Sequence, residues 1–154
     1  MSAVDAAVYA IHLLFAGLWT GSVLFVAYAV LPAARNGDLS AGLLGTLAGK
    51  LTTVSRASAT LLLLTGGHLA AQRYTVTSLT GSLAGYNVLA MLALWFVLAG
   101  LVEVGTSRLV DGTGRDKVRA PAAAARPFIL GASVTAVLLL FNAGVLFAVV
   151  VGLL

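Results

Sequence analysis

Four long apolar runs separated by shorter polar stretches make up most of this 154-residue chain. The first run, residues 3–32, contains no Lys or Arg and carries a histidine, His12, in its interior. A hydrocarbon core about 30 Å thick needs about 20 mostly apolar residues at a rise of 1.5 Å each, and each run meets that requirement. We therefore predict four membrane-spanning helices, over about residues 3–32, 52–72, 83–105 and 127–154.

The backbone of a spanning segment must satisfy its own polar groups, which leaves helices and closed barrels as the structures available in lipid. Runs of this length, joined by connections of about 10 to 20 residues, favour a helical bundle. The predicted fold class is all-α: an integral membrane four-helix bundle, up-down-up-down, forming one transmembrane domain over residues 1–154. Pro32 is predicted to end the first helix, Pro127 to lie in the first turn of the fourth, and residues 108–126 to form a solvated loop.

The basic residues are distributed unevenly over the three connections. Arg73 is the only one of the nine in the second connection, and the others lie in or beside the first and third connections: Arg35, Lys50, Arg56, Arg108, Arg115, Lys117, Arg119 and Arg126. Cytoplasmic loops carry the excess of Lys and Arg. The first and third connections are therefore predicted to be cytoplasmic, with both termini external, in a multi-pass protein of the cell membrane.

Composition narrows the chemistry that is available. Charged residues make up 9% of the chain, against about 25% in soluble domains, so the lipid bilayer is a predicted partner. The net charge of +4 comes from basic residues between the apolar runs, not from a continuous stripe, so no nucleic-acid partner is predicted. The lack of Cys excludes disulfides, thiolate copper sites and Cys-ligated clusters. No HExxH motif, nucleophile elbow or carboxylate pair in the sequence indicates hydrolysis.

The two histidines fall at similar depths in the predicted outer half of the bundle. His12 lies on the order of 12 Å, and His68 on the order of 8 Å, from the outer ends of their helices. Two imidazoles facing each other across antiparallel helices can be the axial ligands of b haem or half of a copper site. His12 and His68 are the predicted metal ligands. The predicted cofactor site also includes Tyr9 and Trp19, on the helical face of His12, and Thr65, one turn before His68.

Three further polar residues, Tyr74, Tyr86 and Asn87, are predicted near the same level, where they would surround the site with polar groups. An alternative is that the histidines are neutral hydrogen-bonding residues that only join helices. Ionisable residues inside a membrane are costly, which favours a functional role. Asn142, in the fourth predicted helix, is expected to form a hydrogen bond between helices.

Arg56 and Glu103 form a second candidate pair, near the predicted cytoplasmic face. Arg56 opens the second predicted helix and Glu103 closes the third, so we predict a structural ion pair that joins adjacent helices. A role in proton or ion entry is the alternative. Lys50 is expected to extend its ammonium group to the membrane interface. Gly17 and Gly21 form a small-xxx-small step that permits contact between two copies in a homo-oligomer.

Several sequence features recur together in a known membrane family: His12 followed by Trp19-Thr20-Gly21 and Pro32, Arg56 leading to Leu64-Thr65-Gly66, and Tyr86 at the start of the third predicted helix. In these features the first two thirds of the chain resemble the copper resistance protein D (CopD) domain family. The resemblance implies a small helical membrane module in copper handling, with metal uptake across the membrane. A more distant resemblance, in the early histidine, is to the HemJ-type protoporphyrinogen oxidase, a four-helix membrane protein that binds b haem.

These observations predict an integral membrane CopD-like protein that binds copper or haem b through His12 and His68 in the outer half of the bundle. Copper handling or transport is the predicted role. One alternative is a haem b redox protein, either an electron carrier or a HemJ-like oxidase. Another is a non-catalytic membrane subunit with structural histidines. The sequence leaves open whether the protein is an enzyme.

Overall fold

The computed structural model describes residues 2–153, and almost all of them are helical. In chain order the elements are α1 (Ala3–Phe25), the π-helical segment η1 (Val26–Val30), α2 (Leu31–Asn36), α3 (Ala41–Arg73), α4 (Val76–Gly81), α5 (Leu83–Val110), the 3-10 helix η2 (Thr113–Arg115) and α6 (Arg119–Val150). No strand occurs within the described residues. The predicted all-α class is therefore confirmed.

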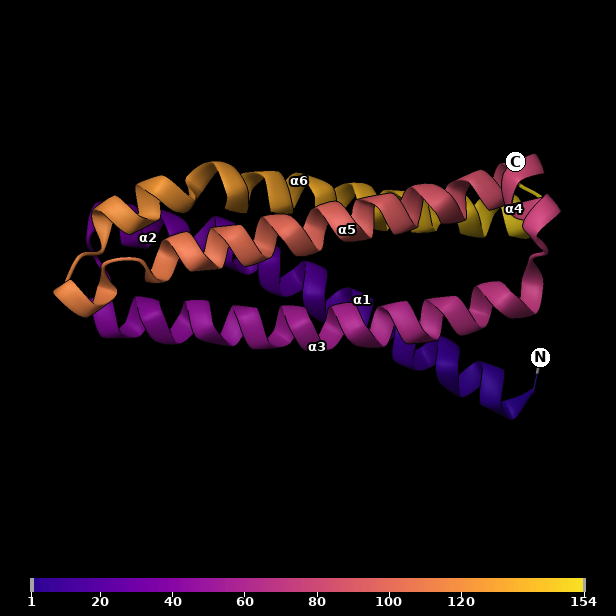
Figure 1. Cartoon of the computed structure of the whole chain (residues 1–154), viewed down its shortest axis with the longest axis horizontal. Helices are drawn as coiled ribbons and strands as arrows, with labels where there is room; N and C mark the ends of the chain where they lie inside the picture. Colours follow the sequence, from indigo (N-terminus) through magenta and orange to yellow (C-terminus); the bar gives the residue numbers. More distant parts are fainter. Residues whose placement is uncertain (1, 154) are drawn as a thin grey trace.

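The long helices lie lengthwise beside one another (Figure 1). Helix α1 packs on α3 and on α6, α3 packs on α5, and α5 packs on α6. Both chain termini and α4 lie at one end of the molecule, while α2 and η2 lie at the other end (Figure 1). Successive long helices are therefore antiparallel, because each short connection reverses the direction of the chain.

Hydroxyl side chains fix where several helices begin. The Ser2, Ser40, Thr75 and Ser82 side chains each accept a hydrogen bond from a backbone N–H in the first turn of the helix that follows. Such N-caps satisfy donors that have no partner within the helix. The connections between helices are therefore much shorter than predicted. Only residues 37–40 lie between α2 and α3.

The prediction that Pro32 ends the first helix is wrong. Helix α1 continues through η1 into α2, and Pro32 lies in the first turn of α2. Proline removes one backbone donor and crowds the preceding turn, and the wider π turn just before it relieves that crowding. The helix ends instead at Gly37, where φ is +85° and the Gly37 and Asp38 N–H groups donate to the Ala33 carbonyl. Glycine adopts this left-handed conformation without strain.

The predicted solvated loop over residues 108–126 is wrong at both ends. Helix α5 continues to Val110, and α6 begins at Arg119, so the non-helical part is short. The alanine-rich stretch is helical because alanine has the highest helix propensity. Ala122 and Ala125 are also fully buried. Pro127 consequently lies inside α6 and not in its first turn.

Three segments of the described chain are long and apolar enough to cross a membrane: Ala3–Asn36, Leu83–Arg115 and Arg119–Val150. Helix α3 is not among them, because it carries Lys50, Arg56, His68 and many hydroxyl residues. It is nevertheless 33 residues long, or about 50 Å at 1.5 Å per residue. A membrane protein is thus supported by three of the four predicted spans.

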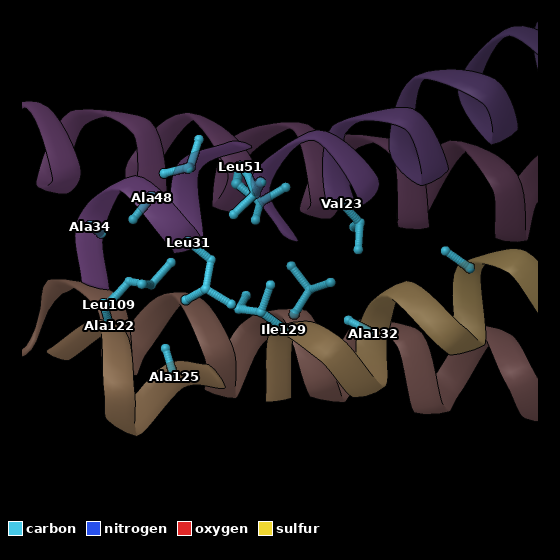
Figure 2. Close-up of a cluster of buried hydrophobic side chains, with 14 of the residues drawn as sticks. Val23, Leu31, Ala34, Ala48, Leu51, Leu109, Ala122, Ala125, Ile129 and Ala132 are labelled. Atoms are coloured by element: carbon cyan, nitrogen blue, oxygen red, sulfur yellow. The ribbon is translucent and has the colours of Figure 1, made fainter. Parts of the chain in front are cut away.

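The buried core lies in the half of the molecule that contains α2 and η2. Figure 2 shows its side chains between the α1–α3 ribbons and the α5–α6 ribbons, among them Val23, Leu31, Ala34, Ala48, Leu51, Leu109, Ala122, Ala125, Ile129 and Ala132. Small residues let the helices approach closely: a Cβ at Gly105 would lie 2.7 Å from the Ile129 Cδ1 atom. Toward the termini, α1 exposes large apolar side chains such as Leu13 and Leu14. This distribution suits contact with lipid, which solvates apolar side chains.

Candidate functional site

A line of polar side chains joins α1 to α3, and we refer to it as the polar seam. It consists of Asp5, His12 and Trp19 on α1 and of Ser55, Thr65 and His68 on α3. The three α1 residues are seven positions apart, which places them on one face of the helix two turns from each other. Three side-chain contacts cross the helix pair: Asp5 with His68, His12 with Thr65, and Trp19 with Ser55.

His12 is held by Thr65. The His12 Nδ1 and Thr65 Oγ1 atoms are 2.8 Å apart. The Thr65 hydroxyl donates its single proton to the Leu61 carbonyl at 2.6 Å, so it accepts from His12, and the imidazole proton is assigned to Nδ1. The Nε2 atom of His12 is then left with a free lone pair, which is the form in which imidazole binds metals.

A glycine makes room for the His12 ring. A Cβ at Gly66 would lie 3.1 Å from His12 Cε1, a tighter approach than side chains normally make. Gly66 therefore lets the imidazole lie against the α3 backbone, beside its partner Thr65. The Gly66-Gly67 pair inside a helix was the signal in the sequence for this close approach, because glycine weakens a helix unless packing requires it.

His68 is held by Asp5, for which the sequence suggested no role. The His68 Nε2 and Asp5 Oδ1 atoms are 3.4 Å apart, and the side chains are 38% and 28% exposed. The other carboxylate oxygen, Oδ2, accepts from the Ser2 backbone N–H at 2.9 Å as part of the α1 N-cap. Asp5 thus anchors the start of α1 and orients the imidazole of His68 at once.

The two histidines predicted to share a metal ion or haem each contact an oxygen atom of the opposite helix. In residues 2–153 no hydrogen bond joins His12 to His68, and no group of three or more His, Cys, Asp or Glu side chains is placed to hold a metal ion. Each ring has one nitrogen engaged with an oxygen atom, Nδ1 in His12 and Nε2 in His68. A closed site with four protein ligands is therefore not formed.

Trp19 is buried in the core, whereas Tyr9 is exposed. The Trp19 Nε1–H donates to Ser55 Oγ at 2.8 Å, and the two residues are 1% and 5% exposed. Trp19 is two turns from His12, about 10 Å along the helix axis, so its role is in packing the core. Tyr9 is 37% exposed and forms no part of the polar seam.

The polar residues predicted to surround the site bond locally instead. Tyr86 donates its hydroxyl to the Thr80 carbonyl at 2.7 Å, and the Asn87 amide donates to the Leu83 carbonyl at 3.0 Å. The Oδ1 atom of Asn142 is buried and has no hydrogen-bond partner within the described residues. The expected bond between helices through that oxygen is therefore not formed.

Arg56 and Glu103 meet across α3 and α5. The Arg56 Nε–H donates to Glu103 Oε2 at 3.2 Å, and Nη2 donates to Oε1. The two side chains are 68% and 51% exposed, so the pair lies on the surface of the helices and outside the polar seam. A bidentate contact of this kind fixes the orientation of the two helices more than it adds stability.

Comparisons of the chain with protein-family models, with curated proteins and with solved structures find no match. The chemistry of the polar seam therefore provides the indication of function. Its distinctive feature is a pair of imidazoles, each oriented by an oxygen atom on the neighbouring helix.

Proposed function

We propose that the chain is a multi-pass membrane protein of the CopD-like type that binds copper through His12 and His68 and acts in copper handling or transport. One observation carries the proposal: each imidazole is hydrogen bonded through one ring nitrogen, which leaves the other nitrogen for a ligand. Metal-binding histidines almost always have this arrangement, in which an oxygen atom orients the ring. Thr65 serves His12 in this way, and Asp5 serves His68.

The donor set favours copper over a bis-histidine haem. Imidazole suits copper, and both ring nitrogens are used as metal ligands in proteins. The nitrogen left free on His68 is Nδ1, which is bonded to Cγ and lies nearer to its own backbone than Nε2 does, so it leaves less room for a porphyrin than for a single ion. Copper bound at this site would lie between two nitrogen donors, with the rest of its coordination open to exchange.

Haem b remains the second candidate because of His12 alone. Its free nitrogen is Nε2, which points away from its own backbone and suits an axial haem bond. Such a site would hold haem b through one histidine ligand, in a HemJ-like oxidase or another haem b redox protein. The third reading, a non-catalytic subunit with histidines that only join helices, predicts no bound group.

We propose further that all four long helices cross the membrane as a bundle. Helices α1, α5 and α6 are apolar enough to span, and α3 connects the far end of α2 to the α4 end, from which α5 starts (Figure 1). If α1 and α5 cross in the same direction, α3 must return across the membrane between them. Its polar face suits this position, because Ser55, Thr65 and His68 point toward α1.

The level of the cytoplasmic interface is indicated by three exposed cations, which we call the basic collar: Lys50 on α3, Arg108 on α5 and Arg126 on α6. Contacts between the helices fix how they are aligned, since Arg56 meets Glu103, and Gly45 and Gly105 face Thr113 and Ile129. Counting along each helix from these contacts brings the three cations to one level. From Arg108 to the start of α5 is about 37 Å, enough to cross the hydrocarbon core with the cations at its edge.

This topology predicts opposite labelling of the two ends of the bundle. Because the chain has no Cys, single substitutions Thr77→Cys in α4 and Gly114→Cys in η2 give clean probes, and both positions are exposed. In intact cells a membrane-impermeant maleimide is expected to label Thr77→Cys, and Gly114→Cys only after permeabilisation, since the basic collar lies on the Gly114 side. The reverse labelling would place the histidines in the inner half of the membrane.

The proposed function is tested by the absorption spectrum of detergent-purified protein, recorded as isolated and after dithionite, with metal analysis on the same sample. We expect near-stoichiometric copper and no Soret band. A Soret band that shifts on reduction would replace copper by haem b. A sample with neither copper nor haem, after growth in copper-supplemented medium, would leave the histidines as structural residues.

A further inference from the structure

A groove of about 380 Å³ lies between α1 and α3, on the surface and outside the polar seam. Its lining extends along α1 and η1 from Gly17 to Val30, about 20 Å of helix. Gly17 and Gly21 form part of its floor, and a Cβ at either position would meet no atom within 4 Å. The two glycines predicted as an oligomer contact thus leave an open channel along the helix pair.

Charge distinguishes this groove from an ordinary apolar surface. Lys50 is its one charged lining residue, and the other lining side chains are apolar except for Ser22. The Ser22 hydroxyl is already used, since it donates to the Leu18 carbonyl at 2.7 Å. Lys50 also belongs to the basic collar, which marks the cytoplasmic interface. The groove therefore combines an apolar channel in the membrane with a cation at the level of the lipid headgroups.

We propose that this groove binds an anionic phospholipid of the cytoplasmic leaflet, with an acyl chain along Gly17 and Gly21 and the phosphate on Lys50. The proposal rests on the membrane orientation given above, but not on copper binding by His12 and His68. A Lys ammonium is a well-established phosphate ligand, and basic residues at this interface attract anionic lipids.

Charge argues against a second copy of the chain in the same place. The groove volume of about 380 Å³ lies within the 300–1,000 Å³ that is typical of pockets for small ligands. In a membrane dimer, the two-fold axis would be parallel to the membrane normal. The two Lys50 side chains would then face each other at one level, and their like charges would repel.

The test is competition between two lipids for the full-length protein. Purified protein in detergent receives equal amounts of phosphatidylglycerol and phosphatidylcholine with identical acyl chains, and native mass spectrometry counts the lipids retained. We expect phosphatidylglycerol to exceed phosphatidylcholine about fivefold, the contribution of one cation near an anionic headgroup. Lys50→Gln is expected to bring the ratio to about one. Arg108→Gln, a matched loss of charge in the basic collar but outside the groove, is expected to keep the wild-type ratio.

A second variant fills the channel without removing charge. A Cβ at Gly21 meets no atom within 4 Å, and the residue lines the groove, so Gly21→Leu is expected to keep the fold and to lose most of the bound lipid of either kind. Three results would overturn the proposal. The first is a phosphatidylglycerol-to-phosphatidylcholine ratio near one in the wild type. The second is an equal drop of this ratio in Lys50→Gln and Arg108→Gln. The third is efficient disulfide formation between two copies of Gly21→Cys in membranes, which would assign the groove to a dimer.

The copper site and the lipid site can fail separately. His12→Ala is expected to keep the phosphatidylglycerol preference, and Lys50→Gln is expected to keep its copper. Wild-type protein that binds no copper but keeps the phosphatidylglycerol preference would reject only the proposed function. Wild-type protein that binds copper but shows no lipid preference would reject only the lipid site.

Discussion

His12→Ala is expected to lower the copper content of the purified protein more than tenfold, because one imidazole leaves the proposed site half ligated. His68→Ala is expected to have the same effect. Loss of an orienting group alone typically costs 10- to 100-fold in metal affinity, so loss of a ligand should cost at least as much. The measurement is metal analysis after dialysis against a weak chelator, with circular dichroism to show that the helices are retained.

Two further substitutions separate a ligand from a residue that only joins helices. Thr65→Val removes the hydroxyl that accepts from His12 and is expected to weaken copper binding about tenfold. Gly66→Ala brings a Cβ to 3.1 Å from His12 Cε1, so the ring must move, and copper binding is expected to weaken while the ring remains present. Tyr9→Phe, one turn from His12 on the exposed side of α1, is the matched control and is expected to keep full copper. If both histidine variants contain as much copper as the wild type, the polar seam has only a structural role.

Trp19→Ala is expected to lower the free energy of unfolding by about 3–5 kcal/mol, the range for truncating a buried aromatic residue. Trp19 is 1% exposed and joins α1 to α3 through its bond to Ser55 Oγ. The substitution opens a cavity in the buried core and leaves the Ser55 hydroxyl without its donor. Unfolding of the detergent-solubilised protein, followed by helical circular dichroism during titration with a denaturing detergent, measures the loss.

The hydrogen bond and the packing of Trp19 are separated by smaller changes. Trp19→Phe removes the Nε1–H group. Loss of this hydrogen bond is expected to lower the free energy of unfolding by about 1–2 kcal/mol beyond the effect of the changed packing, as for other hydrogen bonds between membrane helices. That part of the cost should disappear when Ser55 is already Ala, since the bond is then absent in both proteins. Phe141→Ala is the control, because Phe141 is 71% exposed and its loss opens no cavity. A similar loss of stability for Phe141→Ala and Trp19→Ala would contradict the described core.

The sequence predicts one part of the polar seam, and the tertiary structure determines the other part. Asp5, His12 and Trp19 follow each other at intervals of seven, so the sequence alone places them on one face of α1. The sequence does not give the alignment of α1 against α3 along their length. That alignment depends on how the core packs, with Trp19 buried beside Ser55, and it decides that His12 meets Thr65 while His68 meets Asp5. A shift of one helical turn would move each residue about 5 Å and change every partner.

The errors at the helix ends have a related cause. The sequence predicts helix boundaries at Pro32 and Pro127, because proline breaks the local hydrogen-bond pattern. In the fold both lie within continuous helical segments, since the π turn before Pro32 and the packing of Ala122 and Ala125 beside the second break outweigh the local cost. Packing energy gathered along a whole helix exceeds the loss of one backbone hydrogen bond.

The sequence by itself determined that this chain is helical and apolar enough to enter a membrane, because the length and composition of a run decide whether it can cross hydrocarbon. It also narrowed the candidate metal ligands to two histidines, five carboxylates and two methionines, since no Cys is present. The tertiary structure decided which oxygen atom orients each imidazole, which nitrogen is left free, and where a lipid-sized groove opens between α1 and α3. These features depend on contacts between residues about 30 to 60 positions apart, and such contacts are set by the packing of whole helices and not by their local sequence.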